Sequence, residues 1–146
     1  MFAPDPYFEP DVIVAQDLIE EIWLGTIVTA APALMACHVP FMIDRAGRAR
    51  GTLIGHVDRR NPQWQAIEAT PEVLVTFLGP DAYVSPTWYG TRPRVPTWLY
   101  ASVHVYGRPH IARCRSSSRR SGLAESLTVQ TGRHFAQNGS RLGRVR

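Results

Sequence analysis

Residues 25–57 decide the fold class, and they read GTIVTAAPALMACHVPFMIDRAGRARGTLIGHV. This stretch contains three apolar runs of strand length: Gly25–Ala30, Ala33–Ile43 and Gly51–Val57. Ala31-Pro32 separates the first two runs, and the turn Asp44-Arg45-Ala46-Gly47 separates the last two. Proline and glycine in such short connections are typical of turns between paired strands. The stretch therefore predicts three consecutive antiparallel strands.

The strand pattern continues on the C-terminal side. Three further runs predict strands: Glu72–Gly79, Ala82–Trp88 and Thr97–Gly107. Two short helices are expected, Asp11–Ile22 with Asp11 as its N-cap, and about Asn61 to Glu68 between the third and fourth strands. Six strands with hairpin connections indicate a mainly β protein with peripheral α-helices (α+β), built as a small antiparallel barrel or sandwich.

Charge divides the chain into two unequal parts. Residues 1–112 carry eight Arg against eleven acids, a net charge of −3, and they have the apolar content of one folded domain. Residues 113–146 carry eight Arg against Glu125 alone, a net charge of +7. All sixteen basic residues are Arg, which is what GC-rich DNA read out of frame also produces. We expect residues 113–146 to be a basic Arg/Ser-rich tail, either disordered or out of frame.

The remaining composition points to a cytoplasmic protein. The first residues are acidic and rich in proline, unlike a secretion signal, and no apolar run approaches the length that spans a bilayer, so no membrane partner is expected. The two cysteines, Cys37 and Cys114, lack metal-ligand spacing. No nucleophile elbow, Walker loop or dinucleotide fingerprint is present, so the sequence points away from an enzyme.

The segment GHVDRRNPQW, residues 55–64, carries the best candidate site. A strand ends at Val57, and Asn61-Pro62 then suits the start of a helix. Free backbone amides at the start of this helix, together with the guanidinium groups of Arg59 and Arg60, would form a phosphate site. The competing interpretation is that both arginines are solvated turn residues.

Several ring-bearing side chains are further candidates. Trp88 and Trp98 each lie beside a proline at a strand end, where rings often line the mouth of a pocket and suit a flat heteroaromatic ligand. For Trp98, a place in the barrel core competes with that role. His56 ends the strand that leads into the phosphate candidate, whereas His38 and His104 sit in mid-strand, where packing is the usual role. No carboxylate supports a metal site.

Four segments in order resemble the PaiB-type FMN-binding transcriptional regulators. They are MFAPDPYF at the start, ACHVPFMID, GHVDRRNPQW, and FLGPDAYVSPTWY followed by VPTWLYASVHVYG, and together they span about residues 1–111. The resemblance implies an FMN-binding split β-barrel, a homodimer with flavin at the subunit interface, and negative regulation of transcription. It also implies that Arg59, Arg60 and Asn61 hold the FMN phosphate and that His56 neighbours the ribityl chain. Trp98 and His38 complete the cofactor-binding candidates.

Departures from the family pattern lead to further expectations. Leu99 stands where the family has Asn, and the C-terminal part of the family pattern, with its closing strand, is not recognisable after Ile111. We therefore expect a barrel that is incomplete at the C-terminus and a truncated chain with impaired FMN binding. The alternatives are an FMN-dependent oxidoreductase or flavin reductase on the same fold, and a remnant with little flavin binding. A DNA partner is implied by the family alone.

Overall fold

The computed structural model describes residues 7–88, 95–112 and 124–138. In chain order the elements are β1 (Phe8–Glu9), α1 (Val12–Ile22), β2 (Leu24–Thr29), β3 (Met35–Asp44), β4 (Thr52–Asp58), α2 (Gln63–Ala69), β5 (Val73–Val84), the 3-10 helix η1 (Pro86–Trp88), β6 (Thr97–Ala112) and β7 (Ala124–Asn138). The strands form one antiparallel sheet in the order β1-β7-β4-β3-β2-β5-β6, and an additional pairing of β7 with β6 closes it into a barrel. The expected fold class, mainly β with peripheral helices, is confirmed.

Inward-facing and outward-facing side chains alternate along the strands, and the inward-facing ones form the core of the barrel. Ile27, Leu53 and Val75 are fully buried, and the rings of Phe41 and Phe77 meet edge-on with centroids 6.0 Å apart. Glycine makes room for both rings, because a Cβ at Gly25 would lie 2.8 Å from the Phe77 ring and one at Gly55 would lie 3.0 Å from the Phe41 ring. The two phenylalanine rings thus each depend on a glycine in the neighbouring strand.

Helix α1 begins as the sequence predicts and packs on one end of the barrel. The Oδ1 of Asp11 accepts a hydrogen bond from the amide of Ile13 at 2.8 Å, which satisfies a free amide of the first turn. Ile19 is fully buried in the core, whereas Ile13 is exposed. The connection between β3 and β4 is fastened to this helix by Arg45, whose guanidinium lies 2.7 Å from Asp17 and 2.8 Å from Glu20.

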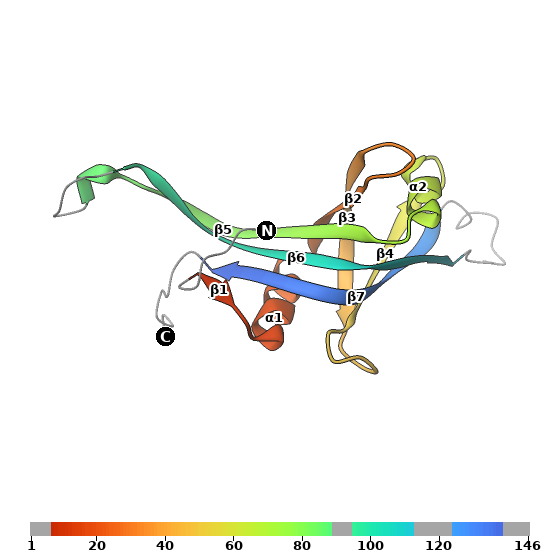
Figure 1. Cartoon of the computed structure of the whole chain (residues 1–146), viewed down its shortest axis with the longest axis horizontal. Helices are drawn as coiled ribbons and strands as arrows, with labels where there is room; N and C mark the ends of the chain where they lie inside the picture. The colour runs from red at the N-terminus through yellow and green to blue at the C-terminus, as the bar shows by residue number, and fades with distance from the viewer. Residues whose placement is uncertain (1–6, 89–94, 113–123, 139–146) are drawn as a thin grey trace.

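The predicted break at Gly79-Pro80 is wrong. Residues 73–84 form one strand, β5, which pairs with β6 on both sides of a register shift between Leu78 and Asp81. Gly79 and Pro80 therefore mark a bulge, which bends a strand without ending it. Because of this continuation, β5 and β6 run together beyond the barrel as a long two-stranded ribbon (Figure 1).

The expectation of disorder in residues 113–146 is wrong for residues 124–138. These form β7, which lies between β4 and β6 and supplies the closing strand that the sequence analysis did not find. Leu127 and Val129 are fully buried, and Glu125 and Thr131 continue the inward row. Strands β4 and β6 pair with β7 along its two edges, and the positive charge of residues 113–146 lies outside it, because residues 124–138 carry Glu125 against Arg133. Residues 113–123 and 139–146 lie outside the described residues, and the out-of-frame hypothesis stays a prediction.

Within the described ranges, neither helix is long and apolar enough to cross a membrane.

Candidate functional site beside the turn after β4

A pocket of about 460 Å³ opens on the outer surface where β3, β4 and the turn before α2 meet. Its lining consists of Cys37, His38, Val39, Pro40, His56, Val57, Asp58 and Asn61. Three of the candidate site residues, His38, His56 and Asn61, therefore meet in one place although they come from three segments. The size and the mix of apolar and polar walls fall within the range of small-molecule sites, about 300–1,000 Å³.

Strands β3 and β4 place the two histidines. The two strands pair antiparallel, with Phe41 opposite Gly55, and inward side chains alternate with outward ones along each. His38 and His56 are the exposed outward members next to buried valines, Val39 and Val57. His38 is held in place because its Nδ1 lies 2.9 Å from the hydroxyl of Thr26 on β2. His38 is therefore hydrogen-bonded, as is usual for a strand histidine, and it also lies in the pocket lining, where its role as a cofactor-binding residue stays a prediction.

The turn of residues 58–61 is closed by hydrogen bonds of its own. The amide of Asn61 donates to the carbonyl of Asp58 at 2.9 Å, and the amide of Arg60 donates to the Asp58 carboxylate at 2.8 Å. The Arg60 guanidinium also forms an ion pair with that carboxylate, with Nη2 2.7 Å from Oδ2. These bonds lower the pKa of Asp58 to about 2, so the pocket carries an ionised carboxylate at neutral pH.

Asn61 lies one residue before the N-cap of α2, contrary to the prediction, yet it accepts amides at the helix start, which are therefore not free. Its Oδ1 accepts the amide of Gln63 at 3.0 Å, and its carbonyl accepts the amide of Trp64 at 3.4 Å. Helix α2 has only 7 residues, and Pro62 occupies the N-cap position. Asn61 also hydrogen-bonds the thiol of Cys37, which opposes the rise in the pKa of that thiol caused by burial. The predicted phosphate cradle of free amides is therefore not what this turn presents.

Arg59 bonds to a residue that the sequence analysis did not consider. Its Nε lies 2.5 Å from Oε1 of Glu125 on β7, whose side chain is only 3% exposed. The carbonyl of Arg59 accepts a bond from the indole of Trp64 at 3.1 Å. The side chain and the backbone carbonyl of Arg59 thus both take part in contacts that hold the turn against the barrel. The available signal for Glu125 was its isolation as the single acid among eight arginines in residues 113–146.

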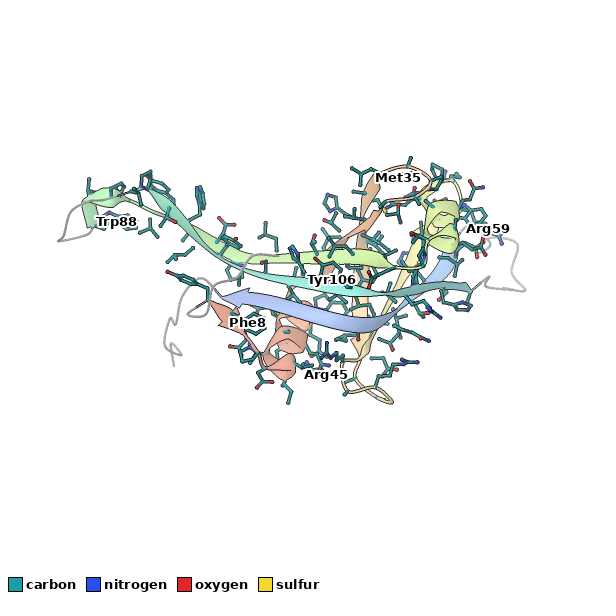
Figure 2. The ribbon with its side chains drawn as sticks, in the orientation of Figure 1. Phe8, Met35, Arg45, Arg59, Trp88 and Tyr106 are labelled. Carbon is teal, nitrogen blue, oxygen red and sulfur yellow. The ribbon has the colours of Figure 1, made fainter. Side chains whose placement is uncertain are left out.

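Trp98 does not reach the pocket. It lies on β6 directly opposite Tyr83 of β5, and the two rings meet at 5.8 Å and 62°. Figure 2 places Trp88, at the end of the same ribbon, at the opposite end of the molecule from Arg59. The proposed role of Trp88 and Trp98 at a pocket mouth is therefore wrong within one chain, and so is the alternative place for Trp98 in the core, because its side chain is 58% exposed.

Two further outcomes concern histidine and metals. The Nδ1 of His104 on β6 is buried and has no hydrogen-bond partner among the described residues, and burial lowers the pKa of this imidazole. The expected hydrogen-bonded packing role is therefore only half right. In the described parts of the chain, no group of three or more His, Cys, Asp or Glu is placed to hold a metal ion.

Comparison with known sequences assigns the family. A family described as "Putative FMN-binding domain" matches residues 1–141. The chain belongs to this family. A protein of Bacillus subtilis named protease synthase and sporulation protein PAI 2 is 39% identical over 118 residues, which are 75% of this chain and 53% of that protein. The resemblance to the PaiB type is thereby confirmed, and the chain spans about half the length of this curated relative.

Solved structures share the fold at low identity. The FAD and heme binding protein from Mycobacterium smegmatis has a TM-score of 0.70 and 16% identity, over 90% of this chain and 73% of that one. The flavocytochrome Anf3 from Azotobacter vinelandii has a TM-score of 0.71 and 11% identity, over 98% and 73% of the two chains. These likenesses show that the barrel is a split barrel.

Proposed function

We propose that this chain binds FMN in the pocket between β3, β4 and the turn of residues 58–61. The observation that carries the proposal is the meeting of His38, His56 and Asn61 in one cavity of about 460 Å³, in a chain of an FMN-binding family. FMN supplies a flat redox-active ring, a polyhydroxyl chain and a phosphate. The two imidazoles and the Asn61 amide offer donors for the hydroxyls and the phosphate, and Val39 and Pro40 offer apolar surface for the ring.

Arg60 is the cation best placed to meet the phosphate. Its side chain is 78% exposed, and among the described residues it pairs with the Asp58 carboxylate in the pocket wall. An exposed ion pair exchanges partners at low cost, so the guanidinium can turn from Asp58 to a phosphate and keep a charge-assisted bond. Arg59 is less free, because the carboxylate it holds is buried and would be left without a cation.

The proposed role is regulatory and not catalytic. The pKa of Asp58 is low, so this carboxyl holds no proton to donate at neutral pH, and burial keeps the nearby Cys37 thiol protonated. By family resemblance we propose a negative transcriptional regulator that works as a homodimer with flavin at the subunit interface. The name of the Bacillus subtilis relative, a sporulation protein, is compatible with control of gene expression.

A flavin titration tests this function. Purified protein should quench FMN fluorescence with saturation at one flavin per chain, and FMN should bind more tightly than riboflavin, which lacks the phosphate. Absence of saturable FMN binding would remove the proposal. Adding NADH or NADPH anaerobically to the complex should leave the flavin absorbance unchanged over minutes, and rapid bleaching would establish the oxidoreductase alternative instead.

A further inference from the structure

Glu125 on β7 is an acid in a row of apolar side chains. Leu127 and Val129 follow it at the next inward positions of the strand, and all three residues are buried. A buried carboxylate is costly to remove from water unless a cation or hydrogen-bond donors accompany it, whereas an apolar residue of the same size has no such cost. The stability of the barrel alone therefore does not explain an acid at this position.

The carboxylate of Glu125 takes its partner from the turn of residues 58–61. Its Oε1 lies 2.5 Å from Nε of Arg59, and its Oε2 is buried without a hydrogen-bond partner among the described residues. The Arg59 side chain is 46% exposed, so water could solvate this cation without the contact, whereas the buried carboxylate has no such alternative. Figure 2 shows Arg59 beside α2, at the end of the barrel where β7 begins. The ion pair therefore holds the turn at one place on the barrel.

The bonds within the turn fix its shape but not its place on the barrel. Asp58 accepts hydrogen bonds from the backbone amides of Arg60 and Asn61, and these bonds move with the turn. Towards the barrel, Arg59 contacts β7, and Asn61 bonds the thiol of Cys37 on β3. The contact of Arg59 is the stronger of these two, because both of its groups are charged whereas a thiol is a weak donor and acceptor.

The turn carries the polar groups that the proposed flavin site needs. Asn61 lines the pocket, and Arg60 is the cation proposed to meet the phosphate. Both lie beyond Asp58, the last residue of β4 that pairs with β7. No residue of β7 belongs to the pocket lining, so Glu125 would act on a ligand only through the turn.

We propose that Glu125 is a positioning residue of the flavin pocket, which acts through Arg59 to hold the turn where Arg60 and Asn61 face the ligand. The ligand in this inference rests on the proposed function, whereas the position of the turn does not. Strand β7 then controls the affinity of a pocket that it does not line. The competing role for Glu125 is to stabilise the barrel and nothing more.

Glu125→Leu separates positioning from stability. Leu has a similar volume and suits the apolar row, so the variant should unfold at nearly the same temperature as the wild type. It should bind FMN roughly tenfold more weakly because the turn is no longer held in the binding arrangement, and riboflavin should lose less because it makes no phosphate contact. Val129→Ala, on the same inward row and opposite Leu53, is the matched control, which should lower the unfolding temperature and leave FMN affinity unchanged. Unchanged FMN affinity in Glu125→Leu, or a loss no larger than in Val129→Ala, would overturn the inference.

A double variant tests whether Glu125 acts through Arg59. In the Glu125→Leu background Arg59 has no carboxylate to hold, so adding Arg59→Ala should not weaken FMN further. A further loss of FMN affinity, with riboflavin unaffected, would show that Arg59 binds the phosphate itself, and the positioning role of Glu125 would be refuted.

The thiol of Cys37 reports the place of the turn without flavin, so the inference and the proposed function can fail separately. This thiol lies half-buried beside Asn61, and burial is the larger influence on its pKa. In a Cys114→Ser background, iodoacetamide should alkylate Cys37 several-fold faster in Glu125→Leu than in the parent chain, as measured by mass spectrometry, and Val129→Ala should leave the rate unchanged. Equal rates in Glu125→Leu and its parent would contradict the inference even if FMN binds tightly. Faster alkylation in a protein whose wild type binds no FMN would keep the positioning role and remove the flavin site.

Discussion

The barrel and the arm, which is the two-stranded ribbon of residues 79–88 and 95–100, contain the same two strands, β5 and β6. The two regions differ in how far the side chains of these strands are buried. In the barrel, β5 and β6 bury Val75, Phe77 and Val103 completely. Beyond the bulge at Gly79-Pro80, the same strands leave Tyr83 and Trp98 about half exposed. Strand pairing is the same in both regions, so the difference lies in what covers the side chains. The barrel side chains are covered by neighbouring strands, whereas the described residues cover Tyr83 and Trp98 of the arm only in part.

The largest expected effect separates the two regions by stability. Phe77→Ala removes a fully buried ring that packs on Phe41 and should lower the free energy of unfolding by about 3–5 kcal/mol. Trp98→Ala removes a ring of similar size from the arm and should cost well under half as much, because most of its surface is already in water. Urea unfolding followed by circular dichroism, at a concentration where the protein is monomeric, measures both. Equal losses would show that the arm is part of the folding core.

The next largest effect tests the phosphate contact in the pocket by comparing two ligands, FMN and riboflavin. If Arg60 meets the phosphate, Arg60→Ala should weaken FMN roughly ten- to a hundred-fold, which corresponds to a charge-assisted bond of ~1.5–3 kcal/mol. Riboflavin has no phosphate, so its affinity should be almost unchanged. Parallel titrations with the two flavins decide, and an Arg60 variant that weakens both equally would place the phosphate elsewhere.

Features of the structure that depend on residues close together in the sequence were predicted well. Asp11 caps its helix as predicted, and β2, β3 and β4 lie within a few residues of their expected bounds because turn residues and apolar runs are local signals. Two of the three pocket residues, His56 and Asn61, were also predicted from a local sequence pattern, namely a strand end followed by Asn-Pro at the start of a helix.

The parts that sequence reasoning missed are those decided by distant pairing. Residues 124–138 are weakly apolar and carry one acid, Glu125, against one Arg, Arg133, and pairing with the edges of β4 and β6 turns them into a strand. Glu125 was invisible as a site residue for the same reason, since its partner Arg59 lies 66 positions earlier. Trp98 was predicted at a pocket mouth or in the core, but continuation of β5 through a glycine-proline pair places it opposite Tyr83 in the two-stranded ribbon, outside the pocket lining.

A smaller effect tests how β7 fastens the turn beside the pocket. Glu125→Gln keeps the shape but removes the charge that faces Arg59, and it should cost about 1–2 kcal/mol, less than a fully buried pair because the Arg59 side chain is 46% exposed. Gln130→Ala, an exposed change on the same strand, is the matched control and should be near neutral. Thermal unfolding of the three proteins side by side gives the comparison. A neutral Glu125→Gln would mean that strand pairing alone holds β7 in the barrel.

The smallest expected effect concerns pH and the exposed pair between Asp58 and Arg60. The folded protein holds the pKa of Asp58 at about 2, below the ordinary value of 3.8, because Arg60 donates side-chain and backbone hydrogen bonds to the carboxylate. A depressed folded pKa gives stability that is fully present above the unfolded pKa and is lost as the pH falls from about 4 towards 2. Asp58→Asn should therefore flatten the loss of stability in that window only slightly, because the pair lies in water where screening is strong. Urea midpoints at pH 2.5, 4 and 7, with Asp81→Asn on the arm as an exposed control, test this. If Asp58→Asn removes most of the acid sensitivity, the pair is a principal fastener of the turn, and Arg60 could not leave it readily for a phosphate.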